Sequence, residues 1–594
     1  MVILGAMSET QRTTSPQTTA PDQGASPTSP GEPLSDVAIA HAHQLEPIAD
    51  IARRAGIPDD ALEPFGTTKA KVTVGKLKPT GAQGKVVLVT GMSPTPAGEG
   101  KSTCLIGLAD GLTRAGVTAM AALREPSLGP VLGMKGGAAG GGYSQVVPME
   151  DINLHFTGDM HAVTAANNAL AALIDNHLHQ GNVLDLDPRK IVWRRCLDVN
   201  DRVLRNVVVG LGGTGGGVPR ESGFDITAAS EVMAVLCLAR DLADLRERLG
   251  RMLVGYTRDN KPVVVHDLGV EGALVALLRE AMSPNLVQTL GGTPAFIHGG
   301  PFANIAHGCN SVIATNAARE LADVVVTEAG FGADLGAEKF TNIASVAGGF
   351  DADVAVIVVT ARSLKFNGGV ARSDLNAENV EAVRAGLVNV AHHCASLRRL
   401  GMQPVVSVNK FTTDTADELA AITRWAGDKG IRVAIANVWS EGGAGAADLA
   451  AQVLEALEDV PVRSGAVSED APTRMYDPSL GVEKSISTIA TDIYGAARVD
   501  YSPQAMKDLS QLTTHGWDTL PVCMSKTPYS LSDDPSALGA PKGHTLHVER
   551  LIPRLGPGFV VALTGTVFTM PGLPKKPAAM EIDVADEGSI TGLF

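Results

Sequence analysis

The chain has 594 residues, 44% apolar and 19% charged, a globular balance that allows two or more domains with large cores. Its formal net charge of −15 excludes a typical nucleic-acid-binding protein, because phosphate contacts need a surplus of Lys and Arg. The six cysteines are scattered, without CxxC pairs or zinc spacing, which favours free thiols in a reducing cytoplasm. We find no apolar run of membrane-spanning length and expect no membrane partner.

The N-terminal segment differs in composition from the rest of the chain. Residues 8–32 are rich in Ser, Thr, Pro and Gln and cannot bury enough apolar area to become ordered. We therefore predict a disordered tail over residues 1–35. Residues 36–55 then favour a helix, with Pro47 as an interruption.

Short runs rich in Val, Ile and Leu alternate with longer Ala- and Leu-rich stretches along the rest of the chain. Runs that are apolar throughout are typical of strands buried on both faces of a parallel sheet, and their alternation with helices indicates βαβ units. The predicted strands are 86–90, 119–123, 207–211, 263–266, 324–327, 354–360, 405–408, 433–437 and 559–563. The predicted helices include 101–115, 225–249, 270–282, 377–400 and 416–428.

Glycine-rich or polar turns follow most of the predicted strands. In open parallel sheets, ligands bind beyond the carboxyl ends of the strands. We therefore expect one large site lined by the turns at Thr90-Gly91, Gly212-Gly213, Asp267-Leu268-Gly269, Glu328-Ala329-Gly330, Asn409-Lys410-Phe411 and Asn437-Val438-Trp439.

One of these turns has the pattern of a phosphate-binding loop. It reads Thr95-Pro96-Ala97-Gly98-Glu99-Gly100-Lys101-Ser102-Thr103, follows the strand 86–90 and opens the helix 101–115. In a P-loop, backbone N–H groups and the helix N-terminus bind phosphate, the lysine reaches the terminal phosphates, and the following hydroxyl holds Mg²⁺. Thr95 stands where the usual pattern has its first Gly, so a glycine-rich turn without function is the alternative. The motif predicts a P-loop NTPase-like α/β fold, mainly a parallel sheet flanked by helices, with additional smaller α/β lobes.

Further polar groups follow the next predicted strand. Arg124 ends the strand 119–123, where it would neutralise charge on a transferring phosphoryl group or an acyl phosphate; a structural salt bridge is the alternative. Residues 135–145 are mostly Gly and Ala and would wrap a ligand with backbone donors or form a lid. Asp159 suits a base or a Mg²⁺ partner, or the N-cap of a helix that begins at Met160.

Several long motifs, taken together and in order, resemble those of one family. They are residues 95–102, 124–130, 135–159, 220–227, 299–311, 328–340, 525–535 and 569–574. Residues 45–594 resemble the monofunctional formate–tetrahydrofolate ligases, and we expect no added dehydrogenase or cyclohydrolase domain.

The resemblance implies an activity and its requirements. Formate would attack the γ-phosphate of ATP bound with Mg²⁺, and the formyl phosphate so formed would pass its formyl group to nitrogen 10 of tetrahydrofolate. The family is stimulated by ammonium or potassium and usually forms homotetramers, and it implies a cytoplasmic enzyme. Its small-molecule partners would be ATP, formate and tetrahydrofolate.

The resemblance also implies roles for single residues. Lys101 and the nucleotide-binding residues 95–103 would bind ATP, with Ser102 on Mg²⁺. Arg124 and Glu125 would hold formyl phosphate, and Asp159 would assist removal of the proton from the folate amine. Phe411 and Trp439, which both follow apolar strands, would sandwich the pterin ring.

We predict that the chain has four parts. After the tail, residues 36–370 would bind nucleotide and formate, residues 371–460 would carry the folate-stacking aromatics, and residues 461–594 would form a covering lobe. Two departures from the family pattern are Ala344-Ser345-Val346, where Lys-Cys-Arg is common, and Asn367, where His is common. Three alternatives are a P-loop ATPase that works as a switch, another P-loop carboxylate ligase, and a folate-binding protein without activity.

Overall fold

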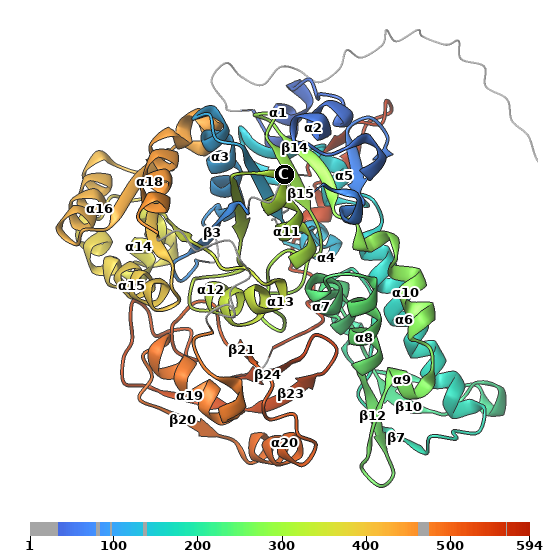
Figure 1. Cartoon of the computed structure of the whole chain (residues 1–594). Helices are drawn as coiled ribbons and strands as arrows, with labels where there is room; N and C mark the ends of the chain where they lie inside the picture. The colour runs from blue at the N-terminus through green and yellow to red at the C-terminus, as the bar shows by residue number, and fades with distance from the viewer. Residues whose placement is uncertain are drawn as a thin grey trace, which may run out of the picture.

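A computed structural model describes residues 34–78, 83–95, 98–134, 139–460, 474–565 and 567–593 (Figure 1). At its centre is a twelve-stranded mixed sheet whose seven parallel strands run in the order β15-β4-β16-β3-β17-β18-β19. Their bounds are Pro294–Ile297 (β15), Ala119–Leu123 (β4), Val324–Glu328 (β16), Lys85–Gly91 (β3), Val354–Val359 (β17), Gln403–Asn409 (β18) and Arg432–Ala436 (β19). The prediction of an α/β fold with a mostly parallel sheet is confirmed.

Helices cover both faces of the parallel strands. Along β3, Val87 and Val89 pack in one core with α3 (Lys101–Arg114) and α18 (Ala447–Glu458). Val86 and Leu88 pack in the opposite core with α15 (Val380–Arg399) and α16 (Ala416–Asp428). Every β3 residue after Lys85 is buried, which explains why the strand reads as a continuous apolar run.

An antiparallel extension completes the sheet beside β15. It contains β14 (Asn285–Thr289), β2 (Lys69–Val72), β1 (Leu62–Phe65), β6 (Ser144–Val147) and β5 (Gly140–Gly141). α2 (Ile48–Arg54) and α11 (Val312–Leu321) pack near this part of the sheet. These strands could not be predicted, because segments such as Asn-Leu-Val-Gln-Thr mix polar with apolar residues.

Besides the run 559–563, which belongs to a separate C-terminal sheet, two predicted strands lie outside the central sheet. β9 (Val207–Val209) forms a partly exposed antiparallel pair with β10 (Arg220–Ser222). β13 (Pro262–Val264) pairs with β12 (Leu253–Thr257) and runs into α9 (Val265–Leu268). The prediction that their turns line the same site is therefore wrong, because apolar composition alone does not distinguish a sheet strand from an outlying hairpin.

The predicted helix 225–249 is also divided. α7 (Glu231–Leu238) ends before α8 (Leu242–Arg251), and the Asp241 carboxylate accepts hydrogen bonds from the first backbone N–H groups of α8. The predicted helix 270–282 likewise ends early, as α10 (Glu271–Leu278) followed by a 3₁₀ turn. The Asp241 cap accounts for the division between α7 and α8.

The C-terminal residues form small sheets of their own, drawn in orange to red in Figure 1. β21 (Val522–Ser525), β24 (Phe559–Leu563) and β23 (Arg550–Arg554) make one sheet, and β20 (Arg498–Tyr501) with β22 (Thr545–Val548) makes another. α19 (Val482–Asp492) and α20 (Pro503–Thr514) accompany them. All six cysteines are free and buried. Within the described ranges, no helix is both long and apolar enough to cross a membrane.

Asp110 is a buried carboxyl group in α3, 2% exposed. Burial, the largest cause, raises its pKa to about 6, while hydrogen bonds from Thr289 and Thr293 oppose the rise. The pKa of Asp110 is therefore higher in the folded protein than in the unfolded chain. The free energy of unfolding consequently falls as the pH rises from about 4 through 6. We expect Asp110→Asn to raise the free energy of unfolding at pH 8 by up to about 3 kcal/mol. Urea titrations from pH 4 to 8 should show the gain disappearing at the acid end; a gain independent of pH would contradict this.

Candidate functional site

The predicted phosphate-binding loop joins β3 to α3 at the carboxyl edge of the sheet. Thr95 and residues 98–103 are described, whereas Pro96 and Ala97 lie outside the described residues. Gly98 and Gly100 have φ values of +80° and +71°, and a Cβ at Gly100 would lie 2.5 Å from Nδ2 of Asn409. Asn409, the last residue of β18, donates a hydrogen bond of 3.0 Å to the backbone O of Glu99. Glycine is thus required at position 100 for both backbone conformation and space.

Lys101, Ser102 and Thr103 form the first turn of α3, a helix of 14 residues. Burial lowers the pKa of Lys101, and the carboxylates of Glu99 and Glu328 oppose this shift. Burial raises the pKa of Glu99, whose Oε1 accepts a hydrogen bond of 2.5 Å from the backbone N–H of Thr95. A lysine held at a helix N-terminus among backbone N–H groups is a suitable arrangement for binding phosphate.

Glu328 connects this loop to Arg124. It is the last residue of β16, the strand between β4 and β3, and is 1% exposed. One carboxylate oxygen accepts a hydrogen bond of 2.9 Å from Ser102 Oγ, and the other accepts one of 3.1 Å from Arg124 Nε. The Arg124 side chain remains 25% exposed. The salt bridge considered as the alternative for Arg124 therefore exists, and it lies inside the candidate site.

Asp159 lies in a buried cluster of charged groups. It is the first residue of α6 (Asp159–His179), and Gly158 occupies the cap position, so the N-cap alternative is wrong. The carboxylate pairs with Lys71 Nζ at 2.7 Å and accepts a hydrogen bond of 2.7 Å from Asn285 Nδ2. The side chains of Lys71 and Asp159 are 3% and 2% exposed. No sequence pattern marked Lys71 as a site residue, because it lies in the unpredicted strand β2.

Glu125 adjoins this cluster. It follows Arg124, and its backbone N–H donates a hydrogen bond of 2.8 Å to the backbone O of Gly299. Burial, and then the negative charge of Asp159, raise the pKa of Glu125 well above its usual range, while Lys71 opposes the rise. Within the described ranges, Oε2 of Glu125 is buried without a hydrogen-bond partner. The structure thus brings Glu125 and Asp159 into one electrostatic unit beside Arg124.

Phe411 and Trp439 follow the ends of neighbouring strands, β18 and β19. The Arg362 guanidinium lies over the Phe411 ring, 3.8 Å from its centroid. Trp439, in α17 (Val438–Glu441), accepts a hydrogen bond of 2.8 Å at its backbone O from Tyr143 N–H. Both aromatic side chains are half-buried, so neither is a fully enclosed core residue.

A glycine hairpin supports the indole of Trp439. A Cβ at Gly142 would lie 2.7 Å from Cγ of Trp439, so only glycine allows this approach. The hairpin is held by the first residue of α1 (Asp36–Ala42), because Asp36 Oδ1 accepts a hydrogen bond of 2.8 Å from Gly142 N–H. Residues 135–138, the first part of the predicted glycine-rich segment, lie outside the described residues.

All but one of the departures from the family pattern occupy buried positions; Val346 is half-buried. Ala344 and Ser345 lie in a π-helical turn, η7 (Phe340–Ser345), and each is 1% exposed. Asn367 ends α14 (Ala361–Asn367), and its Nδ2 donates a hydrogen bond of 3.3 Å to the backbone O of Ser93, just after β3. It also accepts one of 3.2 Å from Gly539 N–H. Asn367 therefore connects the segment after β3 to the C-terminal region.

Comparison with known proteins shows the class of this protein, which is that of the ligases. Residues 34–594 match the family model described as formate–tetrahydrofolate ligase, and the chain belongs to this family. The family resemblance noted in the sequence is confirmed.

Three relatives illustrate the similarity, and each is named formate–tetrahydrofolate ligase. The protein of Corynebacterium jeikeium (strain K411) is 61% identical over 567 residues, covering 94% of this chain and 98% of the relative. That of Corynebacterium diphtheriae is 59% identical over 560 residues, covering 94% and 100%. The protein of Staphylococcus aureus (strain NCTC 8325) is 55% identical over 561 residues, covering 94% of this chain and 100% of the relative.

Proposed function

We propose that this protein joins formate to tetrahydrofolate in an ATP-dependent reaction through formyl phosphate, giving 10-formyltetrahydrofolate, ADP and phosphate. The observation that carries the proposal is the bridge formed by Glu328, which holds Ser102 at the phosphate loop and Arg124 on the neighbouring strand. This bridge puts a nucleotide-binding group and an anion-binding group at one edge of the sheet. Membership of the family supplies the substrates formate and tetrahydrofolate.

In the first step, a formate oxygen attacks the γ-phosphorus of ATP, and ADP leaves. The loop 95–103 binds the nucleotide in a P-loop NTPase-like manner, and Lys101 neutralises its terminal phosphates. Arg124, with its guanidinium oriented by Glu328, neutralises formate and then formyl phosphate beside Glu125. Such positioned cations act mainly by stabilising charge that develops in the transition state.

Mg²⁺ would enter with ATP. Ser102 Oγ and the Glu328 carboxylate are hard oxygen donors 2.9 Å apart, which fits a cation that prefers oxygen and keeps phosphate and water among its ligands. These two residues would hold it, and it would supply charge neutralisation at the phosphates.

In the second step, nitrogen 10 of tetrahydrofolate attacks the formyl carbon and phosphate leaves. The proton on that nitrogen passes to the unit formed by Asp159 and Glu125. Both oxygens of Asp159 are engaged by Lys71 and Asn285, whereas Oε2 of Glu125 is buried without a partner among the described residues. Phe411 and Trp439 hold the pterin between them, with stacking worth about 1–3 kcal/mol per contact by analogy with nucleobases.

The proposal includes further properties of the enzyme. Ammonium or potassium stimulates it, it assembles as a homotetramer, and it acts in the cytoplasm. Residues 36–370 bind ATP and formate, residues 371–460 carry the pterin-stacking aromatics, and residues 461–594 cover the site. The contact between Asn409 and the Glu99 backbone supports a direct connection between the first two parts.

The deciding experiment combines ATP, formate and tetrahydrofolate, singly and together, and measures ADP release. Acidification then converts any 10-formyl product to the methenyl form, which absorbs in the near ultraviolet. We expect the absorption band only when all three substrates are present. ATP hydrolysis without the band would favour a switch ATPase instead.

A further inference from the structure

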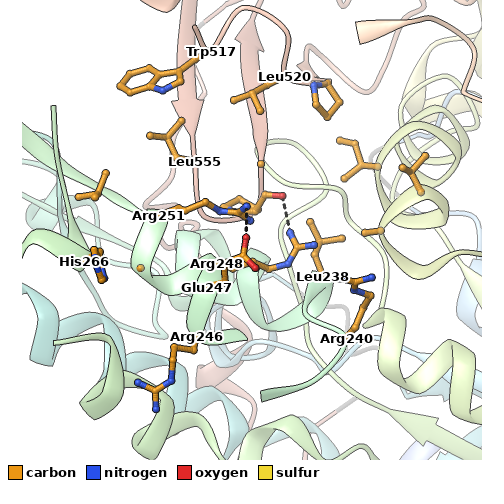
Figure 2. A pocket seen from close by; sticks show the side chains of 18 of the residues that line it. Leu238, Arg240, Arg246, Glu247, Arg248, Arg251, His266, Trp517, Leu520 and Leu555 are labelled. Atoms are coloured by element: carbon orange, nitrogen blue, oxygen red, sulfur yellow. Dashed lines mark hydrogen bonds and ion pairs between the residues drawn. The ribbon is translucent and has the colours of Figure 1, made fainter. Parts of the chain in front are cut away.

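A large groove lies outside the candidate active site. It has a volume of about 1140 Å³ and is formed by α8, the β12–β13 hairpin with α9, the residues after η7, and the turns beside β21 and β24. Figure 2 shows its interior, with side chains of the C-terminal region facing those of α8. None of the proposed ATP, formate or folate residues lines it. Its volume is sufficient for a small organic ligand.

One side of the groove carries a concentration of arginines. Arg240, Arg246, Arg248 and Arg251 come from α8 and its approach, and Arg474 from the C-terminal region. Within the described ranges, three carboxylates lie among them: Glu247 pairs with Arg251 at 3.1 Å, Asp244 pairs with Arg248 at 3.1 Å and Arg240 at 3.3 Å, and Glu271 pairs with His266 at 3.1 Å.

The groove is therefore locally basic in a chain whose net charge is −15. Arg246 is exposed and its positive charge helps to lower the pKa of Glu271, and the Arg251 side chain is 47% exposed. Exposed guanidinium groups on a firmly placed helix suit phosphate and carboxylate oxygens, which they bind in a forked, bidentate geometry.

The opposite side of the groove is apolar. Trp517, Leu520 and Leu555 project into it, as Figure 2 shows, and each is only half-buried. The Trp517 ring is supported by His515, with ring centroids 4.7 Å apart. A supported, partly exposed indole opposite a row of cations favours a ligand with a flat ring at one end and negative charge at the other.

We propose that this groove binds an aromatic polyanion of mononucleotide size, at a site separate from the catalytic one. The ring of the ligand lies against Trp517 and Leu520, and its phosphate or carboxylate groups lie against Arg246 and Arg251. Such a ligand also contacts both α8 and the C-terminal region. These two regions already touch, because Arg248 donates a hydrogen bond of 3.1 Å to the backbone O of Pro557. Binding therefore raises the melting temperature by mass action.

Two probe molecules test whether the groove prefers phosphate or carboxylate groups. Guanosine 5′-monophosphate offers phosphate, and 4-aminobenzoylglutamate offers carboxylates. Each is titrated into the full-length protein at low salt by calorimetry and by tryptophan fluorescence. We expect at least one probe to bind, with quenching that is absent in Trp517→Phe although calorimetric binding persists there. Arg246→Ala combined with Arg251→Ala should weaken binding about tenfold to a hundredfold, whereas Arg53→Ala, an exposed helical arginine paired with Asp50, should not.

The titrations have results that support the proposed binding site and results that overturn it. Binding of either probe that is lost in the double arginine variant supports the groove and identifies the charged group. Binding that survives in that variant but is lost in Lys101→Ala places the probe in the phosphate loop and overturns the proposal. Failure of both probes to bind the wild-type protein at millimolar concentration also overturns it. Circular dichroism of the double variant verifies that it is folded.

Discussion

Arg124→Ala should reduce formation of 10-formyltetrahydrofolate by roughly 10³-fold or more, because positioned arginines contribute about 10³–10⁵ to phosphoryl-transfer rates. The side chain is paired with Glu328 and 25% exposed, and in the proposed mechanism its removal takes away a cation that neutralises formyl phosphate. The change does not touch the loop 95–103, and binding of ATP should remain near that of the wild-type protein. The rate is measured from the methenyl band after acidification, and ATP binding by calorimetry.

Two further variants make the Arg124 result interpretable. Arg124→Lys keeps the charge but loses the planar group that meets Glu328, so it should recover only part of the rate. Arg53→Ala should behave as the wild-type protein, because that arginine lies on α2, outside the candidate site. Normal turnover in Arg124→Ala would contradict the proposed role.

Lys71→Met should lower the free energy of unfolding by about 3–5 kcal/mol, because it leaves the carboxylate of Asp159 buried without a compensating charge. The lysine also donates a hydrogen bond of 3.0 Å to Asn285 Oδ1, so the network loses a second contact. Methionine keeps most of the volume of the side chain and limits the formation of a cavity. Urea unfolding at pH 7.5, followed by circular dichroism, measures the loss.

A double variant tests whether the missing charge is the cause. Lys71→Met with Asp159→Asn removes both charges, so it should be more stable than Lys71→Met alone. An exposed pair is the matched control: Arg53→Ala, which breaks the pair with Asp50, should cost no more than about 1 kcal/mol. Simple addition of the two single effects in the double variant would show that the pair itself contributes nothing.

The parallel part of the fold could be predicted from the sequence, because strands buried on both faces are apolar throughout. β3, β16, β17 and β18 read this way, and the glycine loop 95–103 stands where a strand-to-helix junction places it. The segment 207–211 has the same composition but forms an outlying hairpin, since composition does not specify the pairing partner. β2 and β14 carry polar residues such as Lys71 and Asn285 toward a buried cluster, so no apolar run marks them.

The predicted site residues were easier to find than the groups that orient them. Arg124, Lys101 and Asp159 stand in motifs or at strand ends, where chain position alone suggests a function. Glu328 is separated from Ser102 by 226 residues and from Arg124 by 204, and only the strand order brings the three together. Its signal was nonetheless present, because a glutamate ends a strand that is otherwise apolar. Lys71 offered no such signal, and its pairing with Asp159 depends on the antiparallel extension.

The support for Trp439 has a consequence for the order in which the protein is made. α1 and the hairpin β5–β6 both lie within the first 150 residues and are connected through Asp36 and Gly142, while β6 also pairs with β14, which is synthesised later but before Trp439. Trp439 leaves the ribosome about 300 residues afterwards, and N-terminal regions generally fold first. We therefore expect the contact between Asp36 and Gly142 to form before Trp439 is available to pack on the hairpin. The hairpin that supports the Trp439 ring is thus synthesised before Trp439 itself.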